Sequence, residues 1–267
     1  MRIAFTKDRP MPSHRGYVQG LWGQVHYRAH GEGRPLVLIH QSPWSSMQYH
    51  AVLPRLAARG IAALAPDTPG YGLSDPAPDA TIADHADNLA CVMRARRLAR
   101  ATVSGHHTGA LIAASLAARY PELVAALILD NCPFYTAAER AERLKRPGGE
   151  VAIKPDGSHF TDRWATMRRI ADPTMSDASV QLAVLAWCEA GRDSGHHAAF
   201  RHDASPDIAT IAAPTLLLAS RCDPISGHVD RIAARRPDFQ RADLSGGTAS
   251  VLENPDGWVS AIEPVIA

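Results

Sequence analysis

Long apolar runs are missing from this sequence, since nowhere do about 18 consecutive apolar residues occur, the length that a membrane-spanning helix needs. The first ten residues, MRIAFTKDRP, carry charges among their apolar side chains and so lack the hydrophobic stretch of a signal peptide. Cysteine is scarce: there are four, with no C-x-x-C pair and no metal-like spacing. These absences predict a cytoplasmic protein with reduced thiols, without disulfides and without a zinc site.

An excess of charge of one sign is missing as well. The 28 lysines and arginines nearly balance the 27 aspartates and glutamates, which gives a formal net charge of +1. This balance indicates no basic face for nucleic acid or for an acidic membrane, so we expect a small, nearly neutral molecule as the substrate. The prediction leaves a homodimer open. Only three of the basic residues are lysine, a bias typical of GC-rich bacterial genomes.

Short apolar segments alternate with helical segments through the first half of the 267 residues. This alternation predicts crossover units, and therefore an α/β fold with a mostly parallel, doubly wound sheet covered on both faces. Residues 20–29 are expected to form both strands of a hairpin. The further strands are expected at 35–40, 61–65, 101–104 and 127–130, and the helices at 47–59, 82–97 and 111–119.

The pattern changes after residue 132. Charged helical stretches such as AAERAERLKR and SVQLAVLAWCEA are joined by glycine and proline breaks, without a strong strand signal. Strand character returns with PTLLLAS at 214–220, and a helix at 229–236, a strand near 239–243 and a last helix after NPDG follow. We therefore expect a helical cap at 133–213, inserted into one core formed by residues 17–132 and 214–267.

The stretch SGHHTGA at 104–110 has the form of a nucleophile elbow, G-x-S-x-G, with His107 in the place of the serine. Three further segments, HQSPWSS at 40–46, APDTPGYGLSD at 65–75 and SRCDPIS at 220–226, precede LSGGTASVLENPDGW at 244–258. With these motifs in this order, the chain resembles the α/β-hydrolase fold family over nearly its whole length. The resemblance implies a parallel sheet, an inserted cap and a nucleophile, acid and histidine that follow each other in that order.

The resemblance places Asp223 at the acid position, with Asp130 as the other site that the family sometimes uses. It places His107 at the nucleophile position and Thr248, after Gly247, where the catalytic histidine usually stands. Two of the three triad members are therefore replaced. Loss of triad members typically leaves only about 10³ to 10⁴-fold acceleration over water, so we expect no serine-esterase mechanism.

We hypothesise that His107 is itself a general base. Its imidazole would place the outer ring nitrogen where the lost histidine worked, the small Thr248 would make room, and Asp223 would orient the ring. A histidine with an ordinary pKa near 6.5 suits this role at neutral pH, and general-base catalysis is worth about 10² to 10⁴-fold. The reaction would be attack of water on an activated ester or lactone, or proton abstraction leading to C–C cleavage, isomerisation or elimination. It needs no cofactor.

The family pattern also implies an oxyanion hole built from the backbone N–H groups of Gln41 and Thr108. Trp44 is expected in the wall of the pocket. His106 is a candidate neighbour of the pocket with a mainly structural role beside the elbow. A metal on His106 and His107 is not expected, because adjacent side chains of a strand point in opposite directions.

Two other function classes stay open at this point. The chain could be a hydrolase by ancestry with feeble activity, or a catalytically silent ligand-binding protein that kept the pocket and has a drifted elbow. An enzyme would hold Asp223 or Asp130 within hydrogen-bond reach of His107, whereas a binding protein would not need this geometry. The cap residues that are candidates to line the pocket are His159, Phe160, Trp164, Trp187, His196, His197, Phe200 and His202.

Overall fold

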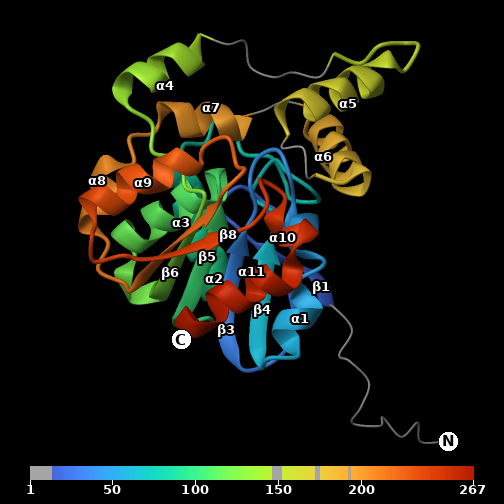
Figure 1. Cartoon of the computed structure of the whole chain (residues 1–267). Coiled ribbons are helices and arrows are strands. Elements are labelled where there is room, and N and C mark those ends of the chain that lie inside the picture. Colours follow the sequence, from blue (N-terminus) through green and yellow to red (C-terminus); the bar gives the residue numbers. More distant parts are fainter. Residues whose placement is uncertain (1–13, 146–151, 172–174, 192–193) are drawn as a thin grey trace, which may run out of the picture.

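The computed structural model describes residues 14–145, 152–171, 175–191 and 194–267, and its centre is one eight-stranded sheet in the order β1-β2-β4-β3-β5-β6-β7-β8 (Figure 1). Strand β2 pairs antiparallel with β1 and β4, and the remaining pairs are parallel. This is the predicted α/β-hydrolase fold, a mostly parallel sheet with helices. The strands are β1 His14–Gln19, β2 Gln24–His30, β3 Arg34–Ile39, β4 Ile61–Pro66, β5 Ala101–His106, β6 Val124–Asp130, β7 Thr215–Ser220 and β8 Gln240–Leu244.

Helices cover both faces of the sheet because the strand side chains alternate between two apolar cores. Val37 and Ile39 of β3 belong to the core on one face, and Leu36 and Leu38 belong to the core on the other. The first core is covered by α2 Ile82–Ala95, α3 Thr108–Arg119, α8 Ser205–Thr210 and α9 Ser226–Arg235. The second is covered by α1 Leu53–Ala57, α10 Ser250–Glu253 and α11 Pro255–Ile262.

The N-terminal hairpin differs from the prediction. Its first strand, β1, precedes the predicted segment 20–29, whose first residues form the turn instead, with Gly20 N–H donating to Gly23 O at 2.8 Å. Gly23 has a φ of +142°, a conformation that side chains rarely adopt. The single helix expected at 47–59 is also split, into a 3₁₀ turn at Ser46–Tyr49 and α1, whose start is set by a proline.

The described residues between 133 and 213 form helices and no strand. Four of these helices lie above the carboxyl ends of the parallel strands in Figure 1: α4 Ala137–Leu144, α5 Ser158–Ile170, α6 Asp177–Ala190 and α7 Ser194–Arg201. The fifth, α8, contributes Ile208 to the core around α3. The segment assigned to the cap from the sequence thus ends with a helix that packs on the core.

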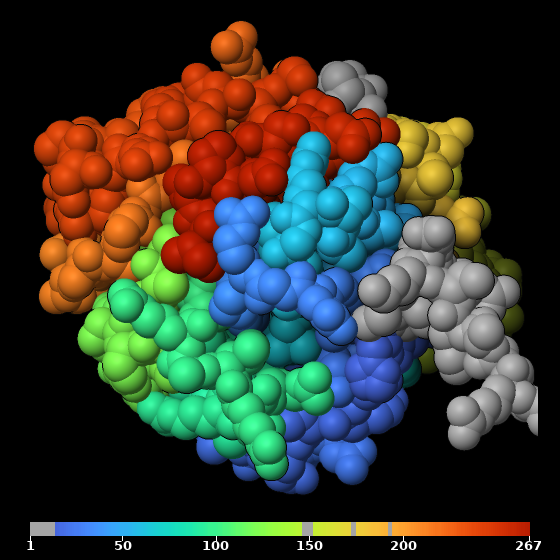
Figure 2. All heavy atoms as spheres, turned by 90° about the horizontal axis from the view of Figure 1, so that it is seen from below, coloured from blue at the N-terminus to red at the C-terminus, as the bar shows by residue number. Residues whose placement is uncertain are grey.

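Seen from below, the surface is formed by the blue-to-green first half of the chain and by its orange-to-red last part, which lie side by side (Figure 2). The yellow helices α5 and α6 appear only at the edge of this view. Within the described residues, no helix combines the length and the apolar character that crossing a membrane requires.

Candidate active site

The turn between β5 and α3 has the geometry of a nucleophile elbow. β5 ends at His106, α3 begins at Thr108, and His107 between them has φ 48° and ψ −115°. Its backbone is held on both sides, because His107 N–H donates to Asp130 O at 3.0 Å and His107 O accepts the N–H of Ala110 at 2.8 Å. This strained backbone presents the ring of His107 at the carboxyl edge of the sheet.

Two glycines allow the strand and the helix to approach this closely. A Cβ on Gly105 would lie 2.1 Å from the carbonyl oxygen of Gly109, and a Cβ on Gly109 would lie 2.2 Å from that of Ile39. Both contacts are with backbone, which cannot rotate away. The elbow therefore depends on these small residues whatever residue stands at its centre.

The substitution Gly109→Ala is expected to destabilise the protein by about 1–3 kcal/mol or more, because the added methyl group would force the elbow apart. The free energy of unfolding, measured by urea denaturation, tests this. Gly227→Ala is the matched control, since Gly227 lies in α9 and a Cβ there would meet nothing within 4 Å. The control is expected to be neutral or slightly stabilising, and an equal loss in both variants would contradict the steric explanation.

His107 and Asp223 form a direct pair: the ring Nε2 lies 2.8 Å from Asp223 Oδ2. Asp223 follows β7, and its other oxygen accepts the N–H of Ile225 at 2.9 Å. The prediction that the outer nitrogen of His107 is the base is wrong, because this nitrogen faces the carboxylate. The other ring nitrogen, Nδ1, has no hydrogen-bond partner among the described residues.

The electrostatics of the pair favour a neutral histidine beside an ionised aspartate. Burial lowers the pKa of His107 below its ordinary value, and this outweighs the opposite effect of Asp223. Burial alone would raise the pKa of Asp223, but its electrostatic attraction to His107 and the hydrogen bond between them bring it down to about 2. At neutral pH the ring therefore donates Nε2–H to the carboxylate and carries a lone pair on Nδ1.

Asp130 is not the partner of the His107 ring, so the alternative acid site is wrong. Its carboxylate is fully buried and accepts hydrogen bonds from Trp258 Nε1 at 2.9 Å and from Asn131 Nδ2 at 3.0 Å. The nearest histidine is His106, whose Nδ1 lies 3.0 Å from Asp130 Oδ2. Burial would lower the pKa of His106, but the negative charge of Asp130 outweighs it and raises the value.

The rings of His106 and His107 stack with centroids 4.4 Å apart and planes 13° from parallel. They were expected to point in opposite directions, but the positive φ of His107 breaks the alternation of the strand. One potential metal-ligand atom from each of His106, His107 and Asp223 lies within 4.8 Å of the other two, so these three residues are a candidate metal-binding group. Lone pairs of parallel rings do not converge on one point, and this geometry does not favour a shared ion.

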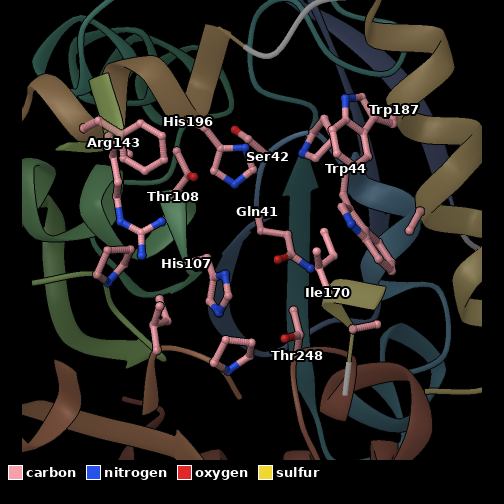
Figure 3. A pocket seen from close by; sticks show the side chains of 18 of the residues that line it. Gln41, Ser42, Trp44, His107, Thr108, Arg143, Ile170, Trp187, His196 and Thr248 are labelled. Atoms are coloured by element: carbon pink, nitrogen blue, oxygen red, sulfur yellow. The ribbon is translucent and has the colours of Figure 1, made fainter. Parts of the chain in front are cut away.

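A cavity of about 530 Å³ lies between the elbow and the helices above it, a volume typical of small-molecule sites. Of the predicted site residues, Gln41, Trp44, His107, Thr108 and Thr248 line it, and Figure 3 shows their side chains around the same space. Asp223 does not line the cavity and contacts it only through its hydrogen bond with the ring of His107. His106, a predicted neighbour of the pocket, does not line it, because it is the last residue of β5 and is buried under the elbow.

The predicted aromatic residues of the cap divide into two groups. Those that line the cavity are Trp187, His196, His197 and Phe200. Those that do not line it are His159, Phe160, Trp164 and His202.

One of the two N–H donors predicted for an oxyanion hole has another partner in the structure. The backbone N–H of Gln41 donates to Gln48 Oε1 at 3.0 Å, so the prediction that it serves the oxyanion hole is wrong. Its side-chain amide is buried and, within the described part of the chain, its Nε2 has no hydrogen-bond partner. Ser42, the next residue, also lines the cavity, and the N–H groups of Ser42 and Thr108 donate to no other described residue.

Ser42 and Arg143 are among the residues of the cavity wall that sequence reasoning missed. In the loop after β3 the N–H without a partner belongs to Ser42, one residue later than the predicted Gln41, and sequence spacing carries no signal for such a difference. Arg143 is one of several charged residues in the stretch AAERAERLKR. Only packing selects which of them faces the cavity.

A protein-family model described as the alpha/beta hydrolase fold matches residues 34–255. Among curated proteins, the chain is 29% identical to the (E)-2-((N-methylformamido)methylene)succinate hydrolase of Acinetobacter baylyi, with 90% of this chain and 89% of that protein covered. It is 35% identical to a haloalkane dehalogenase of Mycobacterium marinum, over 44% of this chain and 41% of that protein. A hydrolase from Pseudomonas aeruginosa has a similar crystal structure, with a TM-score of 0.79 at 21% identity and coverages of 94% and 97%.

Proposed function

Because this chain belongs to the α/β-hydrolase fold family, we propose that it is an enzyme for a small organic substrate in which His107, rather than a serine, performs the central step. The observation that carries the proposal is the distance of 2.8 Å between His107 Nε2 and Asp223 Oδ2, at an elbow that opens into a cavity. His107 acts as a general base and Asp223 orients it. No covalent nucleophile is needed.

The pair supports proton transfer at one defined atom. Asp223 accepts Nε2–H, which fixes the tautomer and leaves the lone pair on Nδ1. When Nδ1 takes a proton, the carboxylate stabilises the resulting imidazolium. A general base of this kind contributes about 10² to 10⁴-fold to the rate.

In hydrolysis, the oxygen of a water molecule attacks the substrate carbonyl while Nδ1 of His107 removes its proton. The negative charge that develops on the carbonyl oxygen is stabilised by two N–H donors, the backbone of Ser42 and the backbone of Thr108 at the start of α3. His107 then returns the proton to the leaving group. In a lyase or isomerase reaction, the same nitrogen would remove a proton from carbon.

The relatives support hydrolysis of small acyl compounds as the first reaction to test. The relative from Acinetobacter baylyi is named as a hydrolase of (E)-2-((N-methylformamido)methylene)succinate, and a further relative, from Mesorhizobium japonicum, as a hydrolase of 2-(acetamidomethylene)succinate. A panel of activated esters, lactones and these two enamides, assayed at neutral pH, tests the proposal. Turnover without an acyl-enzyme that mass spectrometry can trap is the expected result. A trapped acyl group on any side chain would contradict a direct attack by water.

Fluorophosphonate reagents are expected not to label this protein, because labelling needs an activated hydroxyl group at the elbow. Ser104, the nearest serine in sequence, is buried in β5 and does not line the cavity. Intact-mass spectrometry after treatment with a fluorophosphonate probe checks this, with a serine hydrolase as positive control. Stoichiometric labelling at Ser104 or Thr108 would overturn the role given to His107.

A further inference from the structure

Arg143 gives the cavity a local positive charge that the balanced composition of the chain conceals. It is the one arginine or lysine among the described residues that line the cavity, and no aspartate or glutamate is among them. The remaining wall is mostly apolar. In such surroundings an uncompensated cation attracts an anion more strongly than it would in water.

The other charged side chains of α4 have partners. Arg140 pairs with Asp203 at 3.3 Å, and Glu139 pairs with Arg231 at 2.7 Å. Arg143, on the same helix, forms no ion pair within the part of the chain that the structure describes. Its guanidinium is therefore available to a ligand.

Two aromatic rings hold the guanidinium of Arg143 in place. Its Cζ lies 4.6 Å from the centroid of Tyr135 and 5.4 Å from that of Phe200, and both rings line the cavity. Contact with a ring face uses the face of the guanidinium and leaves its N–H groups free to donate within their own plane. A planar carboxylate can accept two of these N–H groups at once.

The opposite wall of the cavity is apolar. In Figure 3 the side chain of Arg143 lies on the same side as Thr108 and His107, and Trp44, Ile170 and Trp187 lie on the other side. A molecule that spans this space would meet a cation at one end and indole rings at the other.

We propose that Arg143 binds a carboxylate group of the substrate, and that the substrate is an amphiphilic carboxylate whose apolar part packs against Trp44 and Trp187. This inference rests on the proposed function only in taking the cavity as the substrate site. It replaces the nearly neutral ligand expected from the net charge, because the charge of the cavity wall, not of the whole chain, decides what binds there.

The test compares two ligands of equal shape, 4-phenylbutyrate and its neutral amide 4-phenylbutyramide, by isothermal titration calorimetry at low salt. The titrations are run at a pH of about 8, above the ordinary pKa of histidine, so that the comparison reports on the guanidinium. The wild type is expected to bind the carboxylate about 10 to 100-fold more tightly than the amide, the range for a hydrogen-bonded charge. In Arg143→Met, which keeps an apolar stem on the aromatic rings, this preference is expected to disappear.

Two further variants make the result specific. Arg140→Met removes a paired arginine from the same helix and is expected to keep the full preference, whereas Arg143→Lys, which has a charge but no planar fork, is expected to keep only part of it. Equal binding of both ligands by the wild type, or an unchanged preference in Arg143→Met, would overturn the proposal. So would an equal loss in Arg140→Met.

The same titration with His107→Ala separates this inference from the proposed function. The preference for the carboxylate is expected to persist in that variant, since Arg143 and the apolar wall are unchanged. If His107→Ala keeps its turnover and also keeps the preference for the carboxylate, the proposed general base fails and the binding role of Arg143 stands. If His107→Ala loses its turnover and the wild type shows no preference for the carboxylate, the proposed general base stands and the binding role of Arg143 fails.

Discussion

The substitution His107→Ala is expected to lower kcat by about 10² to 10⁴-fold while KM changes little, for whichever compound of the ester, lactone and enamide panel the wild type turns over. The reason is that Nδ1 of His107 is the proposed proton acceptor, whereas most of the cavity wall is formed by other residues. His107→Asn, which keeps a polar side chain but has no basic nitrogen, is expected to be equally impaired. Steady-state kinetics of both variants measure the effect.

The matched control is His202→Ala. His202 also pairs with an aspartate, with its Nε2 at 3.0 Å from Asp207 Oδ2, but it does not line the cavity. Its loss is expected to leave kcat unchanged. Full activity of His107→Ala with weakened ligand binding would instead make the ring part of a binding wall and favour the catalytically silent alternative.

The pH dependence of the wild type follows from the same assignment. A base is active when deprotonated, so kcat is expected to fall as the pH drops through the pKa of His107. Because burial lowers this pKa below its ordinary value of 6.5, the midpoint of the fall is expected below pH 6.5. A pH profile of kcat checks this, and a fall centred above pH 7 would point to another group.

The substitution Asp223→Asn is expected to lower kcat by about 10² to 10⁴-fold through the tautomer of His107. The carboxylate accepts Nε2–H, whereas an amide that turns its NH₂ group to the ring donates to Nε2 and moves the proton to Nδ1. The lone pair then no longer faces the cavity. Loss of the negative charge also removes an influence that raises the pKa of His107, so the midpoint of the pH profile moves to lower pH.

Nitrogen-15 NMR of the imidazole distinguishes this positioning role from a merely structural one. The wild type is expected to show His107 protonated at Nε2 near neutral pH, and Asp223→Asn is expected to show it protonated at Nδ1. Asp207→Asn, which alters the aspartate–histidine pair outside the cavity, serves as control and is expected to keep its kcat. A wild-type tautomer with the proton on Nδ1 would contradict the proposed base.

Much of the fold was predictable because its signals are local. The apolar runs of β3, β4 and β5 and the helical periodicity of α2 determine elements whose type depends mainly on neighbouring residues. The elbow was predictable for the same reason, since Gly105 and Gly109 are required within one strand-to-helix turn. The errors at the N-terminal hairpin and at 47–59 lie where turns and a proline set the boundaries.

The composition of the site was predictable only in part. The sequence placed two aspartates after two strands, and either could have faced His107. The structure pairs His107 with Asp223, 116 residues away in sequence, and buries Asp130 against Trp258. Whether the N–H of Gln41 is free for a substrate could not be predicted either, because it depends on the long side chain of Gln48 reaching back to accept it.

The sequence by itself determined the order of strands and helices, the small residues of the elbow and the histidine at its centre, because each depends on residues close together in the chain. Tertiary structure alone decided which aspartate forms a hydrogen bond with His107, which ring nitrogen is left without a partner among the described residues, and that Arg143 rather than Arg140 lines the cavity. These features depend on side chains from distant segments meeting in space. Their direction is set by packing of the whole core and cap, which no local pattern encodes.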